Sequence, residues 1–179
     1  SLTEELLRLE AAALEQEGSS VRPYEGDGNR QYLSGLYLGG QKILILIDSS
    51  FSMLDADLLK ILRLRVAEEK GKLSDDLKKQ SPKWQRVVKT IDWISSRLPI
   101  AGHYQIWEFN ENLESVLGDC LDCWQEVADR DGLNDAIVNV KEIVPANGTN
   151  MEQVFRAITN MSSRPDNIFL VTDGLPTLG

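Results

Sequence analysis

Histidine, cysteine and nucleotide-binding motifs are scarce in this chain of 179 residues, and their scarcity excludes several functions. One histidine, His103, and two cysteines fall short of the four ligands of a typical zinc site. The sequence also holds no Gly-x-Ser-x-Gly motif and no Gly-x-x-x-x-Gly-Lys phosphate loop. A zinc enzyme, a serine hydrolase and a phosphate-loop nucleotide-binding protein are therefore not expected.

Long apolar runs and excess positive charge are absent as well. The longest apolar run, residues 43–47, is too short to span a bilayer, and no signal peptide is evident, so we expect no membrane span. A net charge of −9 repels phosphate backbones, which argues against a nucleic-acid partner. Because the chain starts at Ser1 and not at Met, we expect a processed or excised piece, and its localisation stays unknown.

The two cysteines, Cys120 and Cys123, form a Cys-Leu-Asp-Cys pattern. A redox pair would be expected at the N-terminus of a helix, whereas this pair lies between a Gly-Asp turn and Trp124. We therefore favour structural cysteines, either as two thiols or as one local disulfide.

The length and the 42% apolar content fit one globular domain. Residues 1–40 are predicted to form an N-terminal helix, over 2–17, and a linker rich in Gly, Ser, Asp and Asn. The helix either packs on the domain or ends a longer stalk. The globular domain is predicted to cover residues 41–179.

Within this domain, apolar strands alternate with amphipathic helices. Strands are predicted at 43–47, 104–109, 113–117 and 168–171, the first and last fully buried. Helices are predicted from Pro82 with an inner face of Val87, Ile91, Ile94 and Leu98, at 133–144, and at 150–161 with Val154, Phe155 and Ile158 inward. This alternation predicts an α/β fold: a doubly wound, mostly parallel sheet with helices on both faces.

Residues 54–80 interrupt this rhythm with a segment dense in charges of both signs. We expect an insertion near the carboxyl end of the sheet, mainly a solvated loop with one helical piece. Its basic residues could meet an acidic partner: Arg63, Arg65, Lys70, Lys72, Lys78 and Lys79.

Two predicted strands end at an aspartate, Asp48 and Asp173. Open α/β sheets bind ligands beyond the carboxyl ends of their strands, and two converging carboxylates would repel one another without a cation. Ser50 and Ser52 follow Asp48 at alternate positions, and Thr149 lies in a loop before a helix. Hydroxyl and carboxylate oxygens suit Mg²⁺ or Mn²⁺ better than zinc.

Asp48-x-Ser50-x-Ser52, Thr149 and Asp173-Gly174 together resemble the metal-ion-dependent adhesion site of von Willebrand factor A domains, over about residues 41–179. The resemblance implies a Rossmann-like fold, direct metal contacts from the three hydroxyls, and Asp48 and Asp173 acting directly or through water. It implies a binding module and no enzyme: Mg²⁺, or Mn²⁺, would take an Asp or Glu side chain from a protein partner.

The chain departs from this family in ending at Gly179, where members continue with further strands. We therefore expect a C-terminally truncated sheet and self-association through its exposed edge. Three alternatives stay open. Asp48 could be the nucleophile of a haloacid dehalogenase-type phosphatase, although Ser50 replaces its acid; the fold could bind no metal; or the two serines could merely cap the following helix.

Overall fold

Residues 40–174 are described by a computed structural model of the chain. The helix and linker predicted within residues 1–39 lie outside the described residues. The described part is a mixed α/β structure with a five-stranded sheet in the order β3-β2-β1-β5, with β4 pairing separately with β2. The predicted α/β class and mostly parallel sheet are confirmed.

The central strand is β1 (Lys42–Asp48), which pairs in parallel with β2 (His103–Phe109) on one side and β5 (Asn167–Val171) on the other. Strands β3 (Leu113–Ser115) and β4 (Gln125–Glu126) pair antiparallel with β2. The two-residue β4, which lacks an apolar pattern, was not predicted. Two parallel pairings around β1 bring the carboxyl ends of β1, β2 and β5 to the same edge of the sheet.

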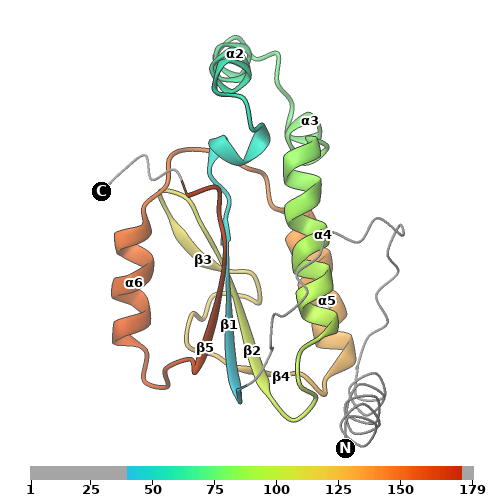
Figure 1. Ribbon diagram of the computed structural model, residues 1–179, viewed down its shortest axis with the longest axis vertical. Helices are drawn as coiled ribbons and strands as arrows, with labels where there is room; N and C mark the ends of the chain where they lie inside the picture. Colours follow the sequence, from blue (N-terminus) through green and yellow to red (C-terminus); the bar gives the residue numbers. More distant parts are fainter. Residues whose placement is uncertain (1–39, 175–179) are drawn as a thin grey trace, which may run out of the picture.

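Alternate residues of β1 belong to two separate cores. Ile43, Ile45 and Ile47 pack with α4 (Pro82–Ser96) and α5 (Arg130–Glu142), while Leu44 and Leu46 pack with α6 (Met151–Asn160). Figure 1 shows the first two helices on one face of the sheet and α6 on the other. This arrangement explains why the strand reads as continuously apolar, because both of its faces are buried.

Capping residues mark where helices α4 and α5 begin. Helix α4 starts at Pro82 as predicted, and the Ser81 hydroxyl accepts a hydrogen bond from the Trp84 amide. Helix α5 starts at Arg130, earlier than predicted, because the Asp129 carboxylate caps the Gly132 amide. In α6 the inward placement predicted for Phe155 is wrong, since this side chain is 52% exposed.

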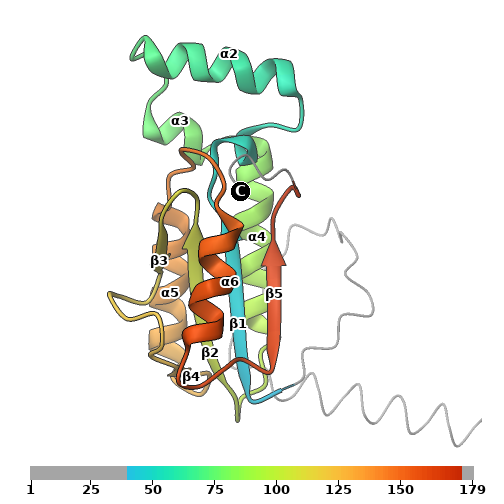
Figure 2. The same ribbon diagram turned by 90° about the vertical axis from the view of Figure 1, so that its left-hand side faces the viewer.

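The insertion is more helical than predicted. After the short helix η1 (Phe51–Leu54), it forms α2 (Leu58–Glu69) and α3 (Asp75–Lys79). Figure 2 shows α2 lying beyond the carboxyl end of the sheet. The expectation of a mainly solvated loop is therefore wrong. Asp57 and Ser74 cap the two helices, which stabilises helical structure in a segment whose charges alone suggested a loop.

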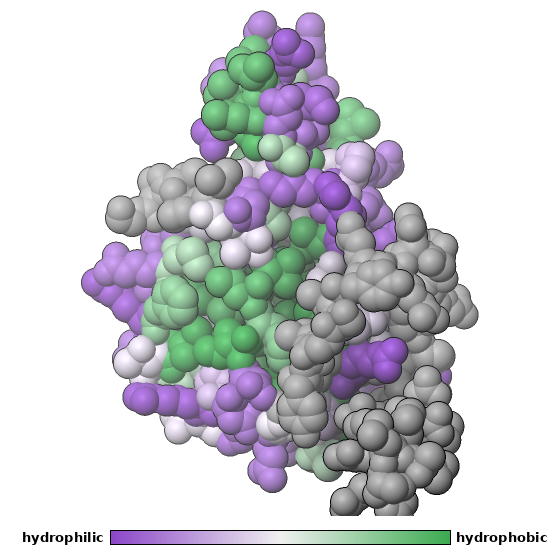
Figure 3. All heavy atoms as spheres, viewed as in Figure 1, coloured by the Kyte–Doolittle hydropathy of each residue, from purple (hydrophilic) through white to green (hydrophobic). Residues whose placement is uncertain are grey.

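Strand β5 is not fully buried, contrary to our prediction. Its Ile168 and Leu170 side chains are 43% and 39% exposed, whereas Phe169 and Val171 pack against the core shared with α4 and α5. Figure 3 shows apolar surface in the middle of this face of the molecule. Within residues 40–174, β5 is an edge strand that pairs with β1 on one side and with no strand on the other.

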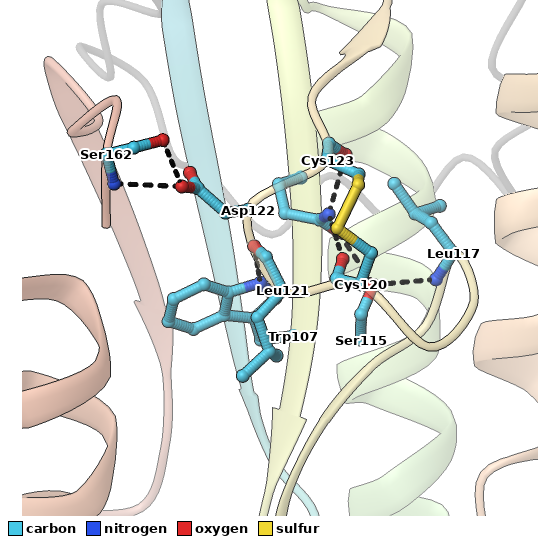
Figure 4. Close-up of a disulfide and its surroundings, with 9 residues drawn as sticks. Trp107, Ser115, Leu117, Cys120, Leu121, Asp122, Cys123 and Ser162 are labelled. Atoms are coloured by element: carbon cyan, nitrogen blue, oxygen red, sulfur yellow. Dashed lines mark hydrogen bonds between the residues drawn. A yellow bond between two sulfur atoms is a disulfide. The ribbon is translucent and has the colours of Figure 1, made fainter. Parts of the chain in front are cut away.

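A disulfide joins Cys120 and Cys123 in the loop between β3 and β4, which decides between the two structural alternatives (Figure 4). The buried Gln105 side chain donates hydrogen bonds to the backbone carbonyls of both cysteines, at 3.1 and 2.8 Å. The Trp107 indole donates to the Leu121 carbonyl at 3.0 Å. These hydrogen bonds hold the disulfide loop against β2 at Gln105 and Trp107.

Across residues 40–174, no helix is long and apolar enough to cross a membrane.

The asymmetric burial of the sheet predicts unequal costs for two matched substitutions. Ile45→Ala should lower the free energy of unfolding by about 2–5 kcal/mol, because Ile45 is fully buried in the central strand. Ile168→Ala on the edge strand should cost well under half as much. Urea denaturation of both variants measures the difference. Equal losses would mean that the β5 face is covered in solution.

Candidate functional site

The carboxyl ends of β1 and β5 are joined by a buried aspartate. Asp48, the last residue of β1, is completely buried. One carboxylate oxygen accepts the Ser50 amide at 3.0 Å and the other accepts the Thr172 hydroxyl at 2.7 Å. Asp48 therefore shapes the loop that follows its own strand and also fixes the chain that leaves β5.

The hydroxyls of Ser50 and Ser52 face one another inside this loop. Their Oγ atoms are 3.0 Å apart, and both residues are buried. Ser50 stands at the N-cap of η1 but its side chain makes no capping hydrogen bond, while Asp57 and Ser81 cap α2 and α4. The interpretation of these serines as simple helix caps is therefore wrong for Ser50.

The loop that carries Thr149 packs directly against the loop after β1. The Phe51 amide donates to the Asn147 carbonyl at 3.0 Å, and the Ala146 amide donates to the Ser49 carbonyl at 2.9 Å. Thr149 itself is completely buried. The structure thus brings together two segments about a hundred residues apart in the sequence, through backbone hydrogen bonds between the two loops.

Asp173 lies beside a lysine that the sequence analysis did not single out. The Lys83 ammonium donates to an Asp173 carboxylate oxygen at 2.9 Å and forms a largely buried ion pair with it. The expected repulsion between the two aspartates is therefore already reduced by a cation of the chain itself. One weak signal was present: a lysine in the first turn of a helix opposes the helix dipole, which favours anions there.

The donor set fits a hard divalent cation. Neighbouring ligands of octahedral Mg²⁺, with metal–oxygen distances of about 2.1 Å, lie about 3 Å apart, which matches the separation of the Ser50 and Ser52 oxygens. No group of three or more His, Cys, Asp or Glu side chains within residues 40–174 is arranged to hold a metal. A metal here would accordingly depend on hydroxyls, with the carboxylates in supporting positions.

A cavity of about 310 Å³ opens between α2 and the loop that carries Thr149. Its walls combine one basic and three acidic side chains with uncharged groups: Phe51, Arg65, Glu68, Glu69, Glu111, Asn147 and Gly148. The Arg65 guanidinium lies 5.5 Å from the centre of the Phe51 ring. The insertion thus contributes directly to the surface next to the candidate site.

The insertion's basic residues are less available than expected. Lys78 is buried and pairs with Glu68, and Lys79 pairs with Glu142 at 2.9 Å. The hydrogen bond with Glu142 raises the pKa of Lys79. Arg65 stacks on the Phe51 ring. The remaining candidates for contact with an acidic partner are therefore Arg63, Lys70 and Lys72.

Searches against protein-family models and against curated proteins find no match for this chain.

A half-buried glutamate lies behind the site. Glu108 of β2 is paired in register with Ile47 and with Glu114. Burial raises the pKa of Glu108, repulsion from Glu114 raises it further, and a hydrogen bond with the Ser49 side chain partly offsets these effects. The folded protein therefore binds a proton at Glu108 more tightly than the unfolded chain does.

This raised pKa predicts a pH-dependent effect of Glu108→Gln. Stability from a carboxyl group with a raised folded pKa is present at low pH and is lost as pH rises through that pKa. The variant should match the wild type at about pH 4 and become more stable than the wild type as pH rises to about 7, because the wild type then increasingly carries the charge that burial and Glu114 disfavour. Urea denaturation at both pH values tests this, with exposed Glu126→Gln as the control. A variant that is less stable at both would contradict it.

Proposed function

We propose that this chain is a von Willebrand factor A-type module that binds a protein partner through a divalent cation and catalyses no reaction. The observation that carries the proposal is the 3.0 Å approach of the Ser50 and Ser52 hydroxyls at the end of the central strand. Asp48 accepts a hydrogen bond from the Ser50 amide and so fixes the loop that carries both serines. The loop that carries Thr149 packs against this loop.

In this proposal each residue of the set has a distinct part. Ser50, Ser52 and Thr149 would hold the cation through their hydroxyl oxygens. Asp48 would act through its hydrogen bond to the Ser50 amide, because both of its oxygens already accept protein donors. Bound Mg²⁺ or Mn²⁺ would supply an electrophilic centre that accepts a carboxylate from the partner.

The partner's selectivity would come from the surrounding surface, because any exposed Asp or Glu could reach a cation. The helical insertion is the natural source, since Phe51 and Arg65 already line the cavity next to the site. Exposed Arg63, Lys70 and Lys72 would provide the contacts that favour an acidic protein.

The phosphatase alternative has less structural support. A nucleophilic aspartate needs an oxygen that can reach the phosphorus atom, whereas Asp48 is fully buried and uses both oxygens as hydrogen-bond acceptors. The position of the second catalytic acid is taken by Ser50, which cannot donate a proton as a carboxyl group does at neutral pH.

The first test of the proposal is Thr149→Ala. Wild-type protein should bind one Mn²⁺ or Mg²⁺ in calorimetric titration, and the variant should lose at least about tenfold in affinity, as is common when a metal site is disturbed. Thr159→Ala, on the exposed side of α6, is the matched control and should bind as the wild type does.

Two results would contradict the proposal. A folded wild type that binds no metal at millimolar concentration would favour the alternative of a metal-free structural module. Equal metal affinity of Thr149→Ala and Thr159→Ala would show that the Thr149 hydroxyl holds no cation.

The second test concerns catalysis. With Mg²⁺ present, the purified protein should release no phosphate from p-nitrophenyl phosphate above the level of a heat-denatured sample. The reason is that Asp48 is buried and each of its oxygens already accepts a hydrogen bond. Turnover that disappears in Asp48→Asn would instead support the phosphatase.

A further inference from the structure

The Lys83 ammonium is fixed by three acceptors next to the candidate metal site. It donates to the Ser52 carbonyl at 2.9 Å, to the Asp55 carbonyl at 3.1 Å and to the Asp173 carboxylate at 2.9 Å. An ammonium group has three donors, so this geometry uses all of them. The Lys83 side chain is 17% exposed, which leaves it little solvent to screen its charge.

Two of these acceptors belong to the segment that also carries the metal-site hydroxyls. The Ser52 carbonyl and the Ser52 hydroxyl come from one residue, so the ammonium cannot move far from the serine pair. Lys83 itself is held in the first turn of α4, whose Trp84 is completely buried. The lysine is thus a rigid part of the site and not a passing surface contact.

A count of charges shows what this lysine does. Among the charged groups at the ends of β1 and β5, Asp48 and Asp173 contribute two negative charges and Lys83 contributes one positive charge, which leaves these three groups at −1. The neighbouring Asp55 carboxylate also lies within the electrostatic reach of Lys83, but it is paired with Lys60 at 3.8 Å, and these two opposite charges cancel in this count. A divalent cation would take the site to +1, and one added carboxylate would return it to zero.

We propose that Lys83 couples the binding of the metal to the binding of the partner's carboxylate. This inference rests on the proposed function. With Lys83 present, the cation alone leaves an uncompensated positive charge in a poorly solvated place, so its affinity is low. The carboxylate removes that excess charge, and each ligand therefore strengthens the binding of the other by the same factor.

A neutral side chain at this position changes the balance. In Lys83→Met the two aspartates alone compensate the cation, so the metal binds well without any carboxylate. The same substitution removes the increase in metal affinity that the carboxylate causes, because an added carboxylate now makes the site negative. Lys83 thus makes the module respond to a metal together with an anionic partner and not to the metal alone.

Calorimetric titration of Mn²⁺ into the protein, with excess acetate, with excess acetamide or with neither, tests this coupling. In the wild type, acetate should raise the Mn²⁺ affinity about tenfold, a usual size for coupling between two ligands, and acetamide should leave it unchanged. Lys83→Met should bind Mn²⁺ about tenfold more tightly than the wild type without acetate, and acetate should add little.

Matched variants distinguish the effect of the Lys83 charge from an effect of the substitution on folding. Lys83→Arg keeps the charge and should keep the acetate effect, and Lys79→Met removes a lysine that pairs with Glu142 away from the site. Lys83→Gln is a second neutral variant that can still donate to the two carbonyls. Thermal denaturation in the presence of a chelator shows whether Lys83→Met and Lys83→Gln are folded. The effect of acetate on the Mn²⁺ affinity of a folded neutral variant then tests the role of the Lys83 charge.

Each remaining outcome is decisive. If the wild type binds Mn²⁺ without any acetate effect, or if the folded neutral variants retain that effect, the role of Lys83 is refuted while the proposed function stands. If none of the folded proteins binds Mn²⁺, both the proposed function and this inference fail.

Discussion

The carboxyl end of the sheet is organised around the burial of the Asp48 carboxylate. A carboxylate without solvent must be compensated by hydrogen bonds or by a cation, and here the Ser50 amide and the Thr172 hydroxyl do so directly. These two donors come from different strand ends. The need to satisfy one buried charge therefore ties the loop after β1, which carries the serine hydroxyls, to the chain after β5.

The insertion is part of the same arrangement. Lys83 lies at the point where the insertion returns to the core, and its bonds to Asp173 and to the carbonyls of Ser52 and Asp55 connect α4 with both strand ends. Helix α2 lies beyond this connection and lines the neighbouring cavity. The insertion, which interrupts the alternation of strands and helices in the sequence, thus lines the cavity next to the site, while Lys83 of α4 contributes charge to the site.

The sequence was most informative where local pattern and burial agree. The run Ile43–Leu44–Ile45–Leu46–Ile47 predicted a central parallel strand because a strand buried on both faces must be apolar throughout. Pro82 predicted the start of α4, because proline is favoured in the first turn of a helix. The pattern failed for Phe155 and for Ile168, because an apolar side chain shows that burial is favourable but not that a neighbour exists to bury it.

By itself, the sequence determined the α/β class, because apolar strand runs and helical spacing are local properties, and it predicted the five residues of the candidate site. The tertiary structure alone decided the disulfide and the edge position of β5. It also decided the role of Lys83: an ion pair between residues 83 and 173 leaves no local pattern, since it forms only when α4 and the end of β5 meet in space.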